Sequence, residues 1–244
     1  MRVRHPRARG QHFLRSSALA ADIVRSAGVR PGELVVDLGA GTGVLTSALA
    51  RAGAHVVAVE LDPALAAKLR DRFPHVVQGD ARRVPLPREP FRVVANLPFD
   101  GATEILRRLL EDKHLVSADV ILQWEVAAKR AAVWPSTAVG VVWAASFDLM
   151  LVRRLPREAF APPPAVDAAV LRAVRRPEPL VPTEHSRRFA QFVHRGFRHG
   201  LRAVAPPLTV KRVARDLGFS QRARPCDLDA HAWAALFGAV RRTR

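Results

Sequence analysis

The chain lacks tyrosine altogether, and it has one cysteine and two methionines among 244 residues. The single thiol, Cys226, excludes an internal disulfide and any zinc site built on several thiolates, so we interpret it as incidental. No apolar run approaches the ~18 residues that a membrane-spanning helix requires, and no membrane segment is predicted. The nine histidines lack the spacing of metal ligands, so no metal is expected. Apolar residues still make up 49% of the chain, which is enough to bury a full core.

The first residues are basic, but no apolar block follows them. This pattern argues against a secretory signal, and we expect a cytoplasmic protein, with a monomer as the default. An arginine-rich organellar transit peptide is an alternative. It is the weaker interpretation because a functional pattern already begins at Gln11.

Acidic residues are scarce, with 22 against 39 basic ones and a net charge of +17. Residues 1–30 carry seven arginines and one acid, and residues 181–244 carry 13 bases and four acids, whereas residues 31–180 are nearly neutral. Only four bases are lysine, as a GC-rich genome would produce, but that bias does not explain the acid-poor ends. A near-neutral centre with basic flanks predicts a polyanionic partner such as nucleic acid.

Apolar segments alternate between strand-like and helix-like spacing along the first two thirds of the chain. Strands are predicted over 33–38, 55–60, 75–78, 92–96 and 119–123, and helices over 44–52, 63–73, 102–110 and 125–132. This alternation predicts an α/β fold with a doubly wound, mostly parallel sheet. Two last strands are expected over 141–151 and 168–174. They leave no room for a crossover helix and should form an antiparallel hairpin.

A proline-punctuated stretch follows the last predicted strand, and helical spacing returns after it. Helices are expected over 186–204, 209–217 and 229–240. The predicted organisation is a basic tail over 1–9, a central domain over 10–176, a linker over 177–184 and a small helical domain over 185–244.

Polar or glycine-rich positions close the first three predicted strands. The first strand ends in Asp37-Leu38-Gly39-Ala40-Gly41-Thr42-Gly43, whose glycines let the chain turn tightly and let a ligand approach the backbone. Glu60 closes the second strand, where a carboxylate can accept both hydroxyls of a ribose, and Asp80 closes the third, within reach of an adenine amino group. The Gly-x-Gly-x-Gly spacing differs from the dinucleotide pattern, and an NAD-type enzyme remains the alternative.

The fourth predicted strand ends in Asn96-Leu97-Pro98-Phe99. In open α/β sheets, ligands bind at this edge. The tetrapeptide offers a carboxamide, a backbone carbonyl ahead of a proline, and an aromatic face. Together these groups could hold an exocyclic amino group and stack on its ring. A plain turn at the end of a strand is the structural alternative.

The ordered strand ends resemble the class I methyltransferases that use S-adenosyl-L-methionine (SAM), and Asn96 to Phe99 resembles the motif of those that modify amino groups of bases. The resemblance implies SAM as cofactor and S-adenosyl-L-homocysteine as product. It also implies a set of cofactor-binding residues: Asp37, Gly39, Gly41, Gly43, Glu60, Leu61, Asp80, Ala81 and Asn96. Asn96 Oδ1 and the Leu97 carbonyl would accept the amine's N–H groups, with Pro98 completing the motif and Phe99 stacking on the extruded base.

Two further motifs resemble the rRNA adenine N6-methyltransferases. Gln11-His12-Phe13-Leu14 resembles the signature that lies over the methionine end of SAM, which implies cofactor contacts from Gln11, His12 and Leu14. The loop from Phe160 to Asp167 resembles that group's proline-rich loop, and Phe160 would flank the target base. A hydrophobic plug is the alternative for Phe160.

Within this group, the chain resembles the erythromycin-resistance (Erm) type more than the housekeeping type. Housekeeping enzymes usually continue Asn-Leu-Pro-Tyr-Asn-Ile, whereas this chain has Phe99-Asp100-Gly101. The Erm resemblance implies N6-methylation of one adenosine in 23S rRNA at the macrolide-binding region, and hence resistance to macrolides, lincosamides and streptogramin B. Housekeeping dimethylation of small-subunit 16S rRNA, DNA adenine methylation and a non-catalytic RNA-binding factor are the alternatives.

The helical domain is expected to contact RNA. Arg195, Arg198 and Arg202 lie close together in the sequence and could line an RNA groove. An ordinary solvated helix face is an equally good interpretation of these three residues. Under the resemblance, the partner is 23S rRNA, protein-free or at an early stage of assembly.

Overall fold

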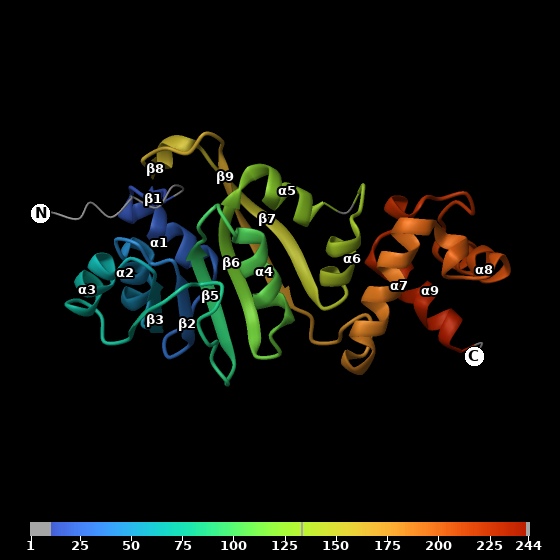
Figure 1. Cartoon of the computed structure of the whole chain (residues 1–244), viewed down its shortest axis with the longest axis horizontal. Helices are drawn as coiled ribbons and strands as arrows, with labels where there is room; N and C mark the ends of the chain where they lie inside the picture. Colours follow the sequence, from blue (N-terminus) through green and yellow to red (C-terminus); the bar gives the residue numbers. More distant parts are fainter. Residues whose placement is uncertain (1–10, 133, 243–244) are drawn as a thin grey trace, which may run out of the picture. The chain divides into compact units, whose positions relative to one another are not determined.

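The computed structural model describes residues 11–132 and 134–242, and the predicted basic tail over 1–9 lies outside them. The chain forms two compact units (Figure 1). The first, which we call the sheet unit, comprises Met1–Ala128 and Met150–Ala173. The second, which we call the helical unit, comprises Lys129–Leu149 and Val174–Arg244. The helical unit thus also takes up a segment that precedes the predicted linker.

A seven-stranded sheet has the order β4-β3-β2-β5-β6-β9-β7. Its strands are β2 (Leu34–Leu38), β3 (His55–Glu60), β4 (Val76–Gln78), β5 (Phe91–Asn96), β6 (Leu115–Gln123), β7 (Phe147–Leu155) and β9 (Ala168–Arg175). The pairs β2–β3, β2–β5, β3–β4 and β5–β6 are parallel, and β7 and β9 close the sheet as an antiparallel hairpin. The predicted α/β class, doubly wound sheet and terminal hairpin are confirmed.

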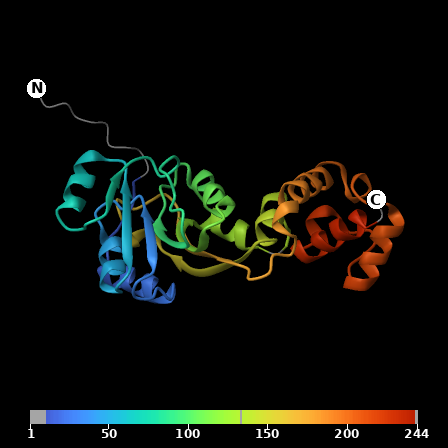
Figure 2. The ribbon, with the colours of Figure 1, turned by 90° about the horizontal axis from the view of Figure 1, so that it is seen from below.

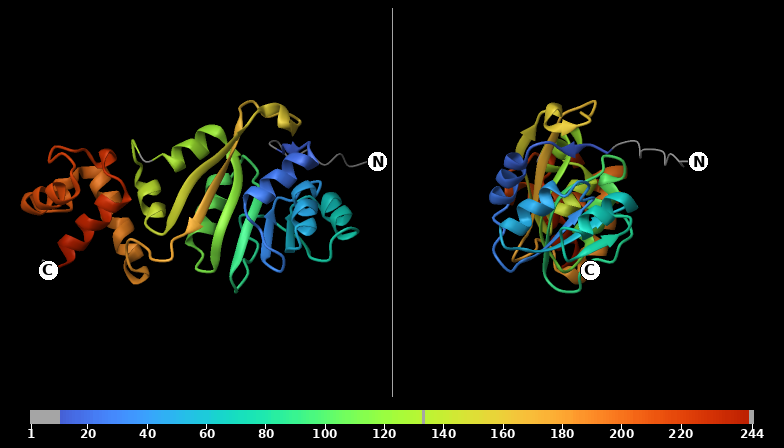
Figure 3. Two further views of the ribbon diagram at one scale, coloured as in Figure 1. Left: turned by 180° about the vertical axis from the view of Figure 1, so that it is seen from behind. Right: turned by 90° about the vertical axis from the view of Figure 1, so that its left-hand side faces the viewer.

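Helices cover both faces of this sheet. They are α1 (Ser17–Ser26), α2 (Val44–Arg51), α3 (Pro63–Arg70), α4 (Ala102–Glu111) and α5 (Trp124–Ala131). In Figure 1, α4 lies in front of the strands, and the view from behind in Figure 3 brings α1 to the front. The helix α4 packs through Ile105, Leu106 and Leu109, whose spacing places them on one buried stripe. These helices leave the carboxyl ends of the parallel strands open for a site.

The predicted strand over 141–151 is wrong in its first half. Residues Ala138–Ala144 form the helix α6, and β7 begins only at Phe147. Thr137 caps the helix, because its side chain accepts a hydrogen bond from Gly140 N. A short apolar run rich in valine fits either a buried strand or a buried helix, so periodicity could not decide between them.

Besides α6, the sequence analysis did not predict a short strand pair and the helix α1. The strands β1 (Phe13–Leu14) and β8 (Phe160–Ala161) form a separate two-stranded antiparallel sheet. The helix α1 follows at once, capped by Ser16, whose side chain accepts from Leu19 N. Pairing of β1 with β8 fixes the segment around residue 12 beside the proline-rich loop.

The helical unit packs around one buried tryptophan, and its helices are seen in Figure 2. Besides α6, its helices are α7 (Ser186–His199), α8 (Pro207–Leu217) and α9 (Ala230–Arg241). Trp233 of α9 is fully buried and stacks on Phe197 of α7, with ring centroids 5.4 Å apart. A Cβ atom built on Gly196 would lie 2.4 Å from the Trp233 ring, so only glycine permits this close crossing of α7 and α9. No helix over the described residues is long and apolar enough to cross a membrane.

Candidate active site

A cavity of about 160 Å³ lies at the carboxyl ends of the parallel strands. Eleven of the predicted site residues line it: Gln11, His12, Gly39, Glu60, Leu61, Asp80, Ala81, Asn96, Leu97, Pro98 and Phe99. The lining also includes residues that the sequence analysis did not single out: Phe13, Val59, Gly79, Arg82 and Asp100. The predicted residues that do not line it are Leu14, Asp37, Gly41, Gly43 and Phe160. Five separate chain segments thus converge on one cavity.

The glycines after β2 make room for neighbouring segments. Gly39 has a φ of +78°, and a Cβ atom built on it would lie 3.5 Å from Pro98 Cδ and 3.6 Å from the Asn96 backbone oxygen. Gly41 has a φ of +56°, and a Cβ atom there would lie 2.6 Å from the Phe13 ring. Glycine is therefore required at position 41 for both backbone conformation and space. The loop over residues 39–43, which we call the glycine loop, thus packs closely against Phe13 of β1 beside the cavity.

Glu60 is buried at the end of β3, and backbone N–H groups fix its carboxylate. Gly41 N donates to its Oε2 at 2.7 Å, and Asp62 N donates to its Oε1 at 2.8 Å. Each carboxylate oxygen has a second lone pair, so the group can still accept hydrogen bonds from a ligand. A fixed, partly satisfied carboxylate at a cavity wall suits recognition of hydroxyl groups.

Asp37 lies behind the cavity wall, and its side chain is 1% exposed. Thr46 Oγ1 donates to its Oδ2 at 2.6 Å, whereas Oδ1 has no hydrogen-bond partner among the described residues. Burial raises the pKa of Asp37 to about 7; the Thr46 hydrogen bond opposes this rise and the Glu60 charge adds to it. Asp37 therefore changes charge near neutral pH.

Asp80 is held by Arg82, which the sequence analysis missed. The Arg82 Nη2 and Asp80 Oδ2 atoms are 2.8 Å apart, and Arg82 Nε donates to both carboxylate oxygens at 3.0 and 3.1 Å. These hydrogen bonds lower the pKa of Asp80. Nothing in the sequence distinguishes Arg82 from the chain's many other arginines. In the structure, it fixes the carboxylate at the β4 end of the cavity.

Asn96 has one satisfied end and one free end. Its Nδ2 donates to the His12 backbone oxygen at 2.6 Å, and its Oδ1 is buried without a partner among the described residues. Because this hydrogen bond holds Nδ2, the direction of Oδ1 is fixed as well. A buried, unpaired amide oxygen is costly, and an incoming N–H group would satisfy it. Leu97 N donates to the Ile121 backbone oxygen at 3.3 Å, which ties the motif to β6.

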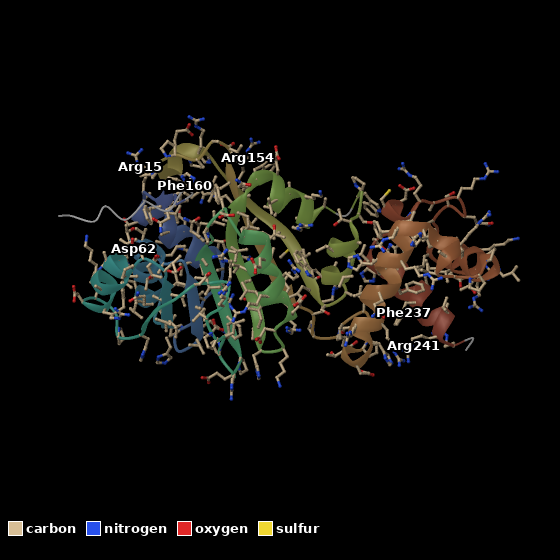
Figure 4. All side chains as sticks on the ribbon, in the orientation of Figure 1. Arg15, Asp62, Arg154, Phe160, Phe237 and Arg241 are labelled. Carbon is tan, nitrogen blue, oxygen red and sulfur yellow. The ribbon has the colours of Figure 1, made fainter. Side chains whose placement is uncertain are left out.

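Phe99 lies between two other aromatic rings. Its centroid is 5.3 Å from that of His12 and 6.4 Å from that of Phe160, the latter in an edge-on arrangement. Phe160 itself is fully buried in the core cluster and pairs with Leu14 across β1 and β8. Figure 4 labels Phe160 at the β8 end of the sheet unit. In this structure Phe160 supports Phe99 from the core side.

The proline-rich loop is tied to the start of the described chain. The His12 Nδ1 atom and the Pro162 backbone oxygen are 2.8 Å apart. Asp167 accepts hydrogen bonds from Arg154 Nε and from the Arg157 backbone N–H, which fixes the other end of the loop. The residues that resemble a methyltransferase signature thus form one connected wall.

The three predicted RNA-binding arginines lie in the helical unit and are exposed. Arg195 lines a groove of that unit, together with other basic residues. Arg198 and Arg202 do not line this groove. Only one of the three residues therefore lines this groove, and RNA contact by all three stays a prediction.

Comparison with known proteins assigns the chain to a family. The family model for ribosomal RNA adenine dimethylase matches residues 4–213. A ribosomal RNA small subunit methyltransferase A from Synechococcus sp. (strain JA-3-3Ab) is 35% identical, over 95% of this chain and 92% of its own length. The mycinamicin-resistance protein MyrB from Micromonospora griseorubida is 34% identical, over 95% of this chain and 78% of its own.

A solved structure agrees with this assignment. The crystal structure of the 23S rRNA methyltransferase ErmE superimposes with a TM-score of 0.84 at 29% identity, covering 94% of this chain and 99% of that chain. The family model covers most of the chain, including every segment that lines the cavity. The chain belongs to the ribosomal RNA adenine dimethylase family and is a SAM-dependent rRNA (adenine-N6)-methyltransferase.

Proposed function

We propose that this enzyme methylates N6 of a specific adenosine in 23S rRNA at the macrolide-binding region, and thereby confers resistance to macrolides, lincosamides and streptogramin B. Under this proposal, it works in the cytoplasm as a monomer on rRNA that is protein-free or in early assembly. A methyl group on N6 would obstruct the drug and remove a hydrogen-bond donor that the drug contacts.

The observation that carries the 23S assignment is the backbone after the Asn96 motif. Gly101 has a φ of +84°, and a Cβ atom built there would lie 3.3 Å from Arg82 Cδ. The housekeeping enzymes usually have isoleucine at this place, and a β-branched residue is strained in that conformation. The backbone directly after the Asn96 motif therefore has a conformation that does not suit the isoleucine of the housekeeping pattern. The similarity to ErmE and MyrB supports the same conclusion.

The cavity's residues fit SAM as cofactor. The Glu60 carboxylate would accept the ribose hydroxyls, and Asp80, held by Arg82, would accept from the adenine amino group. Gln11, His12 and the glycine loop would border the methionine part, since Gly39 lets a ligand approach the backbone. When bound, the cofactor supplies an electrophilic methyl group on a sulfonium.

The residues of the chain then have to orient and activate the nucleophile, which is N6 of the adenine. The lone pair of adenine N6 is delocalised into the ring, and hydrogen bonds accepted from both N–H groups draw that nitrogen toward sp³ geometry. Asn96 Oδ1, which is buried without a hydrogen-bond partner among the described residues, and the Leu97 carbonyl would be the two acceptors. Phe99 would stack on the extruded base and offset part of the unstacking cost, which is on the order of a few kcal/mol. Water can take the released proton.

A second candidate substrate is small-subunit rRNA. The Synechococcus relative, named a small subunit methyltransferase, is 35% identical over 95% of the chain, so the two types are not separated by overall similarity. Housekeeping dimethylation of adjacent adenosines in 16S rRNA would use the same cavity and the same acceptors.

Site mapping separates the two candidates. Purified enzyme and labelled SAM are offered to protein-free 23S rRNA and to small ribosomal subunits, and the modified positions are mapped by primer extension. Label at one adenosine of the macrolide-binding region supports the 23S proposal. Label at adjacent adenosines of the small subunit contradicts it and identifies a housekeeping enzyme. The Asn96→Ala variant serves as the inactive control in both reactions.

A further inference from the structure

A small second cavity, which we call the inner cavity, borders the first one in the sheet unit. Its volume is about 20 Å³, and both Asp37 and Asn96 line it. Phe13, Gly39 and Asn96 line both cavities, so Asn96 stands between them. The other walls of the inner cavity are mostly apolar side chains from β1 and from the start of α2. Asp37 and Asn96 are therefore the two polar side chains that meet in an otherwise apolar space.

The register of the sheet explains why these two side chains meet. In the parallel pair β2–β5, Val36 lies opposite Val93. The same register places the next residue, Asp37, beside Val94. Asn96 follows Val94 by two residues, and side chains two residues apart on a strand point to the same face. Two residues of strand span roughly 7 Å, a distance that two short polar side chains and one water molecule can bridge.

Each of the two side chains has one end held and one oxygen without a partner. Thr46 Oγ1 donates to Asp37 Oδ2 at 2.6 Å. Asn96 Nδ2 donates to the His12 backbone oxygen at 2.6 Å. These bonds fix the direction of the Oδ1 atom in both side chains. Both Oδ1 atoms are buried and have no hydrogen-bond partner among the described residues, so a single donor molecule between them would satisfy both.

We propose that the inner cavity binds one water molecule, which bridges Asp37 Oδ1 and Asn96 Oδ1, and that Asp37 thereby positions Asn96 for methyl transfer. One water molecule needs roughly 10–15 Å³ of such space and two to four polar partners, and the inner cavity meets both conditions. Water donates to a carboxylate and accepts from a protonated carboxyl group, so it suits either charge of Asp37.

The bridging water leaves Asn96 free to act on the substrate. An amide oxygen has two lone pairs, so Asn96 Oδ1 can accept from the water on one side and from an adenine N–H group on the other. With Nδ2 held by His12 and Oδ1 held by the water, the carboxamide is oriented before the base arrives. An acceptor that is oriented in advance needs no reorganisation in the transition state. The inference rests on the proposed function for the role of Asn96 toward N6.

The test compares three variants of the full-length enzyme in methyl transfer to the rRNA that site mapping identifies. Asp37→Leu removes the polar partner of the water. Asp37→Asn keeps it, because the amide can accept from Thr46 and donate to the water. Leu49→Ala is the matched control, since Leu49 is fully buried in the same core cluster and lines neither cavity. The measurements are kcat, the KM for SAM, the unfolding temperature, and crystal structures of wild type and Asp37→Leu.

Asp37→Leu should lower kcat by about tenfold or more at an unchanged KM for SAM, because a misplaced group costs up to about 10² in rate. Asp37→Asn should recover most of that loss. Leu49→Ala should lower the unfolding temperature and keep kcat near that of the wild type. The wild-type crystal structure should show a water molecule within hydrogen-bond distance of Asp37 and Asn96, and that of Asp37→Leu should not.

A wild-type structure without this water would overturn the proposal, even if Asp37→Leu does not fold. Equal losses of kcat in Asp37→Leu and Asp37→Asn would overturn it as well, and so would a wild-type kcat in Asp37→Leu. If the methylated adenosine maps to 16S rRNA while these variants behave as expected, the 23S substrate is wrong and the role of Asp37 stands.

Discussion

At the scale of single residues, the site depends on the direction of the Asn96 side chain. Its Nδ2 is bonded to His12 O, so its Oδ1 can only turn toward an incoming donor. We predict that Asn96→Ala lowers the rate of methyl transfer by about 10²–10³, the usual loss for one oriented hydrogen-bonding group. SAM affinity, measured by calorimetry, should stay nearly unchanged. A variant that retains full activity would remove Asn96 from the proposed role.

Asp37 should make the free energy of unfolding depend on pH up to about neutrality. Burial raises its pKa from 3.8 to about 7, so the folded state keeps a proton that the unfolded state loses between those values. The free energy of unfolding should therefore fall as pH rises from 4 to 7 and level off above 7. Asp37→Asn should abolish this decline, which is roughly 4 kcal/mol at most, given about 1.4 kcal/mol per pKa unit.

Urea titrations of wild type and Asp37→Asn between pH 4 and 8 check this prediction. Thr46→Val is the matched control, because Thr46 donates the hydrogen bond that lowers the Asp37 pKa. The free energy of unfolding of Thr46→Val should keep falling to higher pH than that of the wild type. Parallel pH profiles for wild type and Asp37→Asn would show that Asp37 is ionised throughout.

At the scale of elements, the glycine loop and β1 depend on each other. A Cβ atom on Gly41 would meet the Phe13 ring at 2.6 Å, and the φ of +56° is itself unfavourable for alanine by about 1–2 kcal/mol. We predict that Gly41→Ala destabilises the protein and weakens SAM binding. Phe13→Ala in the same chain should restore part of both, because the clash is gone.

A double-mutant cycle on unfolding free energy and SAM affinity measures this coupling. The strain of the left-handed conformation persists in the double variant, so recovery should be incomplete. Strictly additive losses would mean that β1 moves away from the loop at no cost.

Sequence analysis predicted the sheet and most of the cavity, because strand ends in an α/β fold meet at one edge. Eleven predicted residues line the cavity for this reason, although they come from five segments. Arg82 escaped because its role depends on a pairing with Asp80 that sequence spacing does not mark. The helix α6 escaped because its valine-rich run fits a buried strand equally well. Phe160 lies in the core because β8 turns it away from the cavity, a consequence of a strand pairing that was not foreseen.

At the scale of the whole molecule, each unit has its own hydrophobic core. Trp233 centres the core of the helical unit, whereas the sheet unit packs around residues such as Leu49 and Phe160. We predict that Trp233→Ala destabilises the helical unit by about 3–5 kcal/mol, the usual cost of removing a buried tryptophan ring. SAM binding, which we propose uses only the cavity of the sheet unit, should persist.

Amide hydrogen exchange followed by mass spectrometry checks this prediction, with SAM calorimetry on the same sample. Exchange should rise in α7, α8 and α9, and stay low in β2, β5 and β6. Phe197→Leu, which alters only one partner of Trp233, provides a milder control. Uniform loss of protection across both units would show that they unfold as one cooperative body.

The bond between His12 and Pro162 spans 150 residues, and β1 pairs with β8 over a slightly shorter sequence separation. Contacts of such sequence separation form late, because the loop-closure entropy must be spent before they bring any gain. During synthesis, the wall of the cavity beside Phe99 cannot close until the proline-rich loop has left the ribosome. A nascent chain can therefore complete this wall of its cavity only after most of the protein has emerged.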